Sequence, residues 1–104
     1  MEVFWISHTI RDKTTPKGDY AKRYSALTTG LNDVSDGWWP EPTSFVAFGS
    51  DADLSRIVSI VKGAIDVSCD IVVIGKPHFK SMTVVGKVEH MDALESVVEF
   101  AKKA

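Results

Sequence analysis

The chain has 104 residues, of which 44% are hydrophobic and 25% charged, and its formal net charge is −2 at pH 7. These values predict one folded domain over residues 1–104 rather than a disordered chain. The negative total argues against a protein that coats nucleic acid. No apolar run reaches about 18 residues and no signal-peptide pattern opens the chain, so we expect no membrane partner. The single Cys69 cannot form an internal disulfide, which favours a cytoplasmic location.

The first quarter of the chain predicts a strand, a loop and the start of a helix. Residues 3–10 are rich in β-branched and aromatic side chains, which is typical of a central strand. The stretch "RDKTTPKG" that follows has the charges, proline and glycine of a loop. From Asp19 onward, apolar side chains recur at spacings of four, three and four, which predicts one face of a helix: Tyr20, Tyr24, Leu27 and Leu31.

Two adjacent tryptophans follow this helix, in the stretch "GWWPEPTSFVAFGSDAD". Trp38 and Trp39 suit a short strand, but Pro40 and Pro42 cannot donate to a neighbouring strand, so this strand is expected to lie at the edge of a sheet or to stop early. Successive residues of a strand face opposite sides, so one ring is expected in the core and the other outward, at an interface. A further strand is predicted over residues 43–49.

The second half begins with a predicted capping box, in which Ser50 and Asp53 start a helix. Its apolar face comprises Leu54, Ile57, Val58, Val61, Ala64 and Ile65. "CDIVVIG" then reads as a buried strand, "KPHFK" as a turn and "SMTVVGKV" as another strand. This last strand can fold back as a hairpin or extend the sheet of a second copy.

The C-terminal segment predicts a helix over residues 91–104, because Leu94, Val97, Val98 and Ala101 share one helical face. This face needs a surface that buries it, since each Leu or Val contributes roughly 1.5–3 kcal/mol when buried. We therefore predict a homodimer to which residues 82–101 contribute. The predicted interface residues are Trp38, Trp39, Leu94, Val97 and Val98.

The predicted order is β, α, β, β, α, β, followed by a strand and a helix. This order indicates an α+β protein with a ferredoxin-like core over about residues 2–76 and an extension over 81–104. The pieces "FWISHTI", "GDYAKRYSAL", "GWW", "TSFVAF", "DADLSRIVSIV" and "DIVVIGK" resemble the SinR-like proteins, small prokaryotic or phage relatives of the CRISPR-associated adaptation nucleases. The resemblance implies a metal-dependent phosphodiesterase site, built on an aspartate that ends the first strand and meets its twin across a dimer axis.

The residue that matches this aspartate is Thr9, a neutral hydroxyl and a poor ligand for Mg²⁺. Asp12 lies three residues on and is a weak candidate for the same role. His8 is a weak candidate for a general base, but a lone histidine on a strand is more often a packing or surface residue. Cys69 has the neighbours of an inert buried thiol, and His78 and His90 lack the spacing of metal ligands. We therefore expect no catalytic residue, no metal and no cofactor.

Five basic residues against two acids make the segment from Arg11 to Arg23 locally positive. They are Arg11, Lys13, Lys17, Lys22 and Arg23, and they predict either phosphate contacts or a solvated surface. Trp5 can stack on a base if the sheet face is open. The function predicted from the sequence is a small, non-catalytic binding or regulatory protein that forms a homodimer. The alternative is a metal-dependent endonuclease that acts on RNA or DNA.

Overall fold

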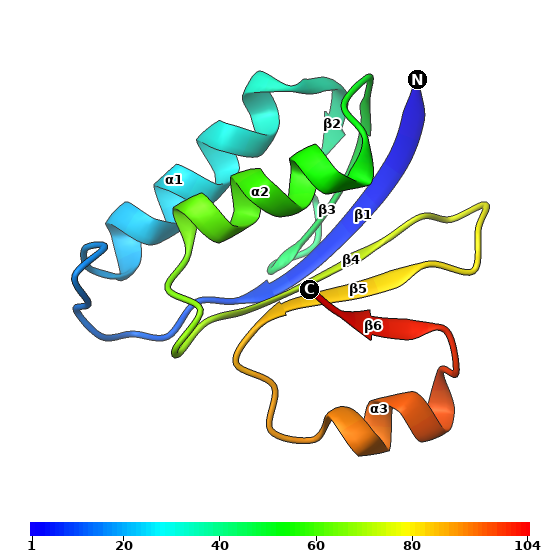
Figure 1. Cartoon of the computed structure of the whole chain (residues 1–104). Helices are drawn as coiled ribbons and strands as arrows, with labels where there is room; N and C mark the ends of the chain where they lie inside the picture. Colours follow the sequence, from blue (N-terminus) through cyan, green and yellow to red (C-terminus); the bar gives the residue numbers. More distant parts are fainter.

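The computed structural model describes residues 1–104 and has three helices and one six-stranded sheet, which confirms the α+β class. In chain order the elements are β1 (Glu2–Thr9), α1 (Tyr20–Asp33), β2 (Ser35–Trp39), β3 (Phe45–Ser50), α2 (Leu54–Ala64), β4 (Ile71–Gly75), β5 (Met82–Gly86), α3 (Met91–Val97) and β6 (Ala101–Lys103). Figure 1 shows α1 and α2 side by side over one face of the sheet, with α3 apart from them.

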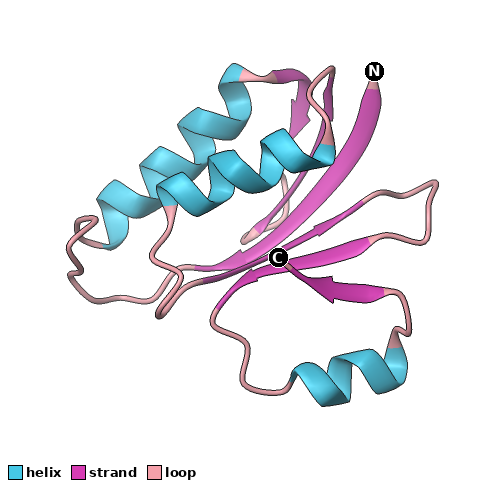
Figure 2. Cartoon of the chain, in the orientation of Figure 1, coloured by secondary structure: helices cyan, strands magenta, loops and turns pink.

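The strand order is β2-β3-β1-β4-β5-β6, and every neighbouring pair is antiparallel except β5 and β6. The predicted edge position of the tryptophan strand is confirmed, since β2 ends the sheet. The alternative left open for the strand after "KPHFK" is also resolved, because β5 folds back as a hairpin on β4, with Val73 opposite Val84. Figure 2 shows this hairpin and the loop that closes it.

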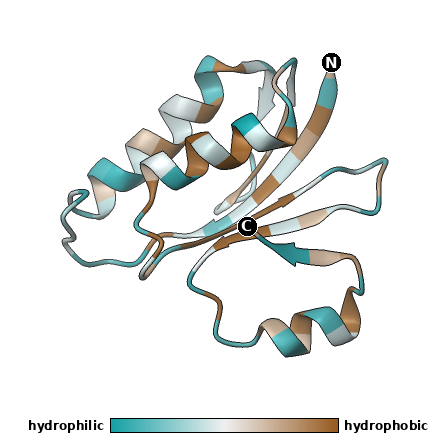
Figure 3. Ribbon diagram, in the orientation of Figure 1, coloured by the Kyte–Doolittle hydropathy of each residue, from teal (hydrophilic) through white to brown (hydrophobic).

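The core lies between the sheet and the two helices α1 and α2. Phe4 and Ile6 lie two residues apart in β1, so both point toward the helices, and both are fully buried. They meet Leu27 of α1 and Ile57 of α2, which belong to the same cluster of buried apolar side chains. In Figure 3 the hydrophobic colour gathers on α2 and on the central strands. This packing fixes α1 against the sheet and so sets the position of the side chains at the N-terminal end of α1.

The two main helices begin with aspartates. Asp19 caps α1 by accepting from the Lys22 N–H. The predicted capping box at Ser50 is wrong, because the cap of α2 is Asp53, which accepts from the Arg56 N–H. Ser50 instead ends β3, and its hydroxyl donates to the backbone carbonyl of Val34.

The C-terminal segment differs most from its prediction. Its helix ends at Val97, and Ala101 begins β6, which pairs in parallel with β5. Val84 and Val85 are adjacent in β5 and both fully buried, so both faces of this strand are covered.

Of the three interface residues predicted in this C-terminal segment, Leu94 and Val98 are half-buried within their own chain. Val97 is 83% exposed and remains available at the surface. None of the three helices has the length and apolar character needed to cross a membrane.

Candidate ligand-binding site

A cavity of about 400 Å³ opens between the N-terminal half of α1, the end of β1 and the connection from β2 to β3. The side chains and backbone that line it come from three separate parts of the chain. They are His8, Tyr20, Tyr24, Thr28, Trp38, Pro40, Glu41, Pro42, Thr43, Ser44, Phe45 and Val46. The volume lies within the range of about 300–1,000 Å³ that is usual for small-molecule sites.

Helix α1 supplies one wall through Tyr20, Tyr24 and Thr28, which lie four residues apart and so follow one line along the helix. The two tyrosine rings stack, with centroids 5.9 Å apart and planes 20° from parallel. Tyr20 is 42% exposed and Tyr24 is 38% exposed, so they are not buried with Leu27 and Leu31, the residues predicted on the same helical face. The buried stripe of α1 consists of Arg23, Leu27 and Leu31 instead.

His8 forms the floor beside this tyrosine pair. It follows Phe4 and Ile6 at the same two-residue spacing along β1 and therefore points, like them, to the helix side of the sheet. Its ring meets Tyr24 edge-on, with centroids 5.6 Å apart and planes at 65°. Burial lowers the pKa of His8 from its ordinary 6.5, because it disfavours the charged imidazolium. The weak sequence candidate for a general base is thus a half-buried side chain on the floor of the cavity.

The connection between β2 and β3 forms the opposite wall. Pro40 and Pro42 fix their backbone angles on either side of Glu41, the one charged residue of the lining at neutral pH. Ser44 has a φ of 58°, the left-handed region that few residues other than glycine adopt. Its carbonyl accepts from the His8 N–H at 3.0 Å, which ties this connection to β1. The two prolines and this hydrogen bond restrict the backbone of the wall.

The tryptophan pair divides as the sequence predicts. Trp38 packs against the core, with its ring 5.7 Å from that of Phe48, and also lines the cavity. Trp39 is 49% exposed. One ring therefore serves the core and the cavity, whereas the other is available to a partner.

The face of the sheet away from α1 and α2 carries a second aromatic group. Trp5 lies between Phe4 and Ile6 in β1 and therefore faces away from these helices. Its ring stacks on Phe45 at 6.1 Å, and Trp39 meets Phe45 edge-on at 6.3 Å. These three rings form a row across β1, β3 and β2, which we call the aromatic row.

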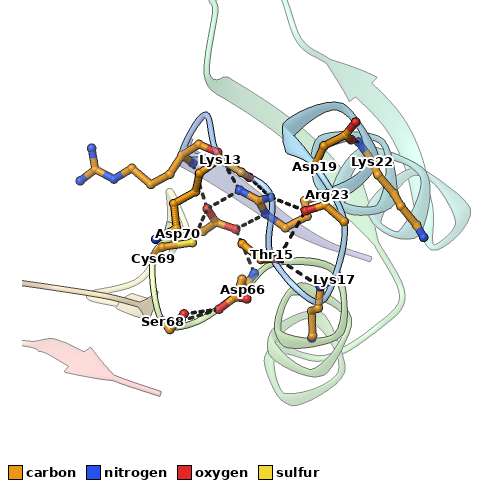
Figure 4. Close-up of polar contacts among 12 residues, drawn as sticks. Lys13, Thr15, Lys17, Asp19, Lys22, Arg23, Asp66, Ser68, Cys69 and Asp70 are labelled. Carbon is orange, nitrogen blue, oxygen red and sulfur yellow. Dashed lines mark hydrogen bonds and ion pairs between the residues drawn. The ribbon is translucent and has the colours of Figure 1, made fainter.

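The basic segment does not form one surface (Figure 4). Arg23 is fully buried, which corrects its assignment to a nucleic-acid surface. Its Nε donates to Asp70 at 2.9 Å, and its Nη atoms donate to the carbonyls of Arg11, Lys13 and Gly18. A guanidinium has five N–H donors in a fixed fork, and here they hold the loop from β1 to α1 closed.

The other four basic residues are exposed, and one of them has an internal partner. The Lys17 ammonium donates to the carbonyls of Lys62 and Gly63, at 2.9 and 3.3 Å. These carbonyls belong to the last turn of α2, where a cation is favoured. Arg11, Lys13 and Lys22 are the exposed members of the predicted set whose charged groups make no such internal hydrogen bond.

Asp70 and Cys69 lie beneath the same loop. Burial on its own would raise the pKa of Asp70, but hydrogen bonds from Arg23 and from the N–H groups of Asp66 and Arg11 outweigh it and lower this pKa. Burial raises the pKa of the Cys69 thiol, and the neighbouring carboxylate adds to the effect. Cys69 is therefore the buried, weakly ionising thiol that its neighbours predict.

The positions that the nuclease resemblance singles out are separate from the cavity. Thr9 is exposed at the end of β1, opposite Ile71, and Asp12 is exposed in the following loop. No group of three or more His, Cys, Asp or Glu side chains is placed to share a metal ion. Comparison of the chain with protein-family models, curated proteins and solved structures found no match. The chemistry of the site therefore rests on its own residues.

The cavity residues of α1 and of the β2–β3 connection were missed as site residues by sequence reasoning. A signal was present, since Tyr20, Tyr24 and Thr28 form a stripe of their own beside the apolar stripe through Leu27. The bracket of two prolines around Glu41 was a second signal, because it marks a rigid connection rather than a mobile loop.

Proposed function

We propose that the chain is a small, non-catalytic binding protein whose ligand occupies the cavity between α1 and the β2–β3 connection. One observation carries this proposal: rings from three elements, His8, Tyr24 and Trp38, meet around a hollow of about 400 Å³. A cavity lined by aromatic side chains with a few polar groups is the usual form of a small-molecule site. The neutral His8 provides one N–H donor and one acceptor to orient a ligand.

A ferredoxin-like core is part of the same proposal. The order β2-β3-β1-β4, with antiparallel neighbours and with α1 and α2 together on one side, supports it. Kinship with the SinR-like proteins is proposed on the sequence pieces alone. A cytoplasmic location is proposed because the one cysteine, Cys69, is a buried thiol.

The binding proposal is tested by a fragment screen in solution, read by ligand-observed NMR. We expect several fragments to bind and to compete with one another for one site. Tyr24→Ala is expected to weaken them about fivefold or more, since an aromatic contact contributes about 1 kcal/mol. Phe79→Ala is the matched control, because Phe79 is a 65% exposed ring that does not line the cavity. Hits that Tyr24→Ala leaves unchanged would contradict the proposal.

A second candidate function is the binding of single-stranded nucleic acid, and the aromatic row is the observation that favours it. Aromatic rings on an open sheet face stack on bases, and Arg11 and Lys13 are exposed beyond the end of β1. A labelled oligonucleotide should then bind at low salt and dissociate steeply as salt is raised. Trp5→Leu should weaken this binding and Trp38→Leu should not. No binding of any oligonucleotide at low salt would remove this candidate.

A homodimer is proposed on the exposed apolar side chains at the two ends of the sheet. Val97 is 83% exposed in the C-terminal segment and Trp39 is 49% exposed on β2. Large exposed apolar side chains of this kind are enriched at interfaces. Light scattering at high micromolar concentration should give the mass of two chains, and Val97→Asp or Trp39→Asp should shift it to one. A single-chain mass for the unaltered protein would refute the dimer.

A further inference from the structure

We infer that the ligand of the cavity is an organic cation, such as a substituted ammonium group on a short arm. This inference rests on the proposed function and specifies the chemical class of its ligand. The observations that carry it are the charge of the lining, the aromatic rings around it and the exposure of Glu41.

The charge of the lining is negative at neutral pH. Glu41 supplies a carboxylate, and no lysine or arginine lines the cavity. His8 is the one side chain of the lining that could carry a positive charge near neutrality, and its burial disfavours the charged form. An anion would meet Glu41 with no cation to offset it, whereas a cation gains an opposite charge.

The aromatic rings of the lining also favour a cation over an anion. Tyr20, Tyr24 and Trp38 are three of the side chains whose ring faces carry the negative end of an aromatic quadrupole. A cation within about 6 Å of such a ring is attracted to it, and quaternary ammonium groups are the usual ligands of aromatic cages. Tyr20 and Tyr24 both line the cavity and stack on each other, with planes 20° from parallel, so two rings stand at the same wall. Apolar substituents on the nitrogen would contact the same rings.

The exposure of Glu41 fits a ligand whose cationic group lies near the opening of the cavity. Glu41 lines the cavity and is exposed, so its carboxylate can meet a cation there without being buried. An exposed carboxylate keeps most of its hydration and contributes modestly to each contact. Most of the discrimination is therefore expected from the rings, and a smaller part from Glu41.

The experiment is isothermal titration calorimetry of the full chain with choline and with 3,3-dimethylbutan-1-ol, its neutral carbon analogue of the same shape. We expect choline to bind saturably at one site and the neutral analogue to bind roughly threefold to thirtyfold more weakly. Tyr24→Leu keeps an apolar wall but removes the ring, and it should reduce choline binding while affecting the analogue less. Glu41→Gln should weaken choline severalfold.

Glu99→Gln is the matched control for charge, because it removes an exposed carboxylate that does not line the cavity. It should leave both affinities unchanged, and circular dichroism should show every variant folded. Equal affinity for choline and its analogue, with both weakened by Tyr24→Leu, would overturn the cation inference and leave the ligand site standing. No heat with either compound, together with no fragment in the cavity, would overturn both proposals.

Discussion

The Arg23 guanidinium donates to the Asp70 carboxylate at 2.9 Å, and neither side chain is exposed to solvent. The two residues are 47 positions apart, on α1 and just before β4. Asp70 also accepts from the N–H groups of Arg11 and Asp66, each at 2.9 Å. One buried ion pair thus joins the loop before α1, the helix itself and the approach to β4. This junction holds the N-terminal half of α1, which forms one wall of the cavity.

Breaking this pair should strongly reduce stability. Removing one partner of a buried ion pair leaves the other charge uncompensated, which typically costs about 3–5 kcal/mol. We therefore expect Asp70→Ala to lower the free energy of unfolding by about that amount, measured in urea. Asp12→Ala removes an exposed carboxylate from the same region and should change it by about 0.5 kcal/mol or less. Similar values for the two variants would show that the pair does not stabilise the fold.

The same carboxylate should make the fold sensitive to acid. The pKa of Asp70 is lower in the folded chain than its usual 3.8, so the folded state favours the charged form. Its contribution is present above about pH 4 and is lost as the pH falls through the lowered value. Asp66 acts in the same direction, because hydrogen bonds from Ser68 lower its pKa too. The stability difference between the unaltered chain and Asp70→Asn should be constant from pH 5 to 7 and shrink below about pH 4.

Two glycines offer a paired test of close packing. The Trp5 indole lies flat over Gly75, its partner in the β1–β4 register, and a Cβ there would overlap the ring. Gly75→Ala should displace the ring and lower the unfolding free energy by about 1–3 kcal/mol. Gly63 in α2 has no atom within 4 Å of a Cβ, so Gly63→Ala should raise it by up to about 1 kcal/mol. A harmless Gly75→Ala would mean that Trp5 does not rest on β4.

The non-catalytic assignment predicts no cleavage of RNA or DNA. Thr9 stands where the resemblance implies an anionic ligand, and a neutral hydroxyl holds Mg²⁺ poorly. Single-stranded and double-stranded substrates incubated with Mg²⁺ or Mn²⁺ should remain at the level of the buffer control. Metal-dependent turnover that disappears in Asp12→Ala would favour the endonuclease instead.

Local patterns in the sequence predict most of the sheet and the two main helices. The β-branched and aromatic residues of β1 and the prolines after Trp39 are local signals, and the structure places β1 inside the sheet and β2 at its edge. Trp38 and Trp39 divide between core and surface for the same reason, since adjacent strand residues face opposite sides.

The predictions that are wrong concern positions whose structure depends on residues far away in the sequence. Apolar spacing favours Tyr20 and Tyr24 as the core face of α1, but Arg23 is buried there because Asp70 neutralises it from 47 positions away. Val98 and Ala101 continue a helical spacing, yet the chain leaves the helix because β5 offers an open edge to β6. The cavity itself joins His8, Tyr24 and Trp38 from three elements, and no single stretch of sequence contains it.

The proposal of a ligand cavity is tested most directly by the three indole N–H signals in ¹H–¹⁵N NMR spectra during titration with the best-binding fragment. Trp38 lines the cavity, whereas Trp5 and Trp39 belong to the aromatic row. We predict a saturable shift of the Trp38 signal, with the signals of Trp5 and Trp39 nearly unchanged. Shifts of Trp5 and Trp39 without Trp38 would place the ligand on the open sheet face and contradict the cavity as the binding site.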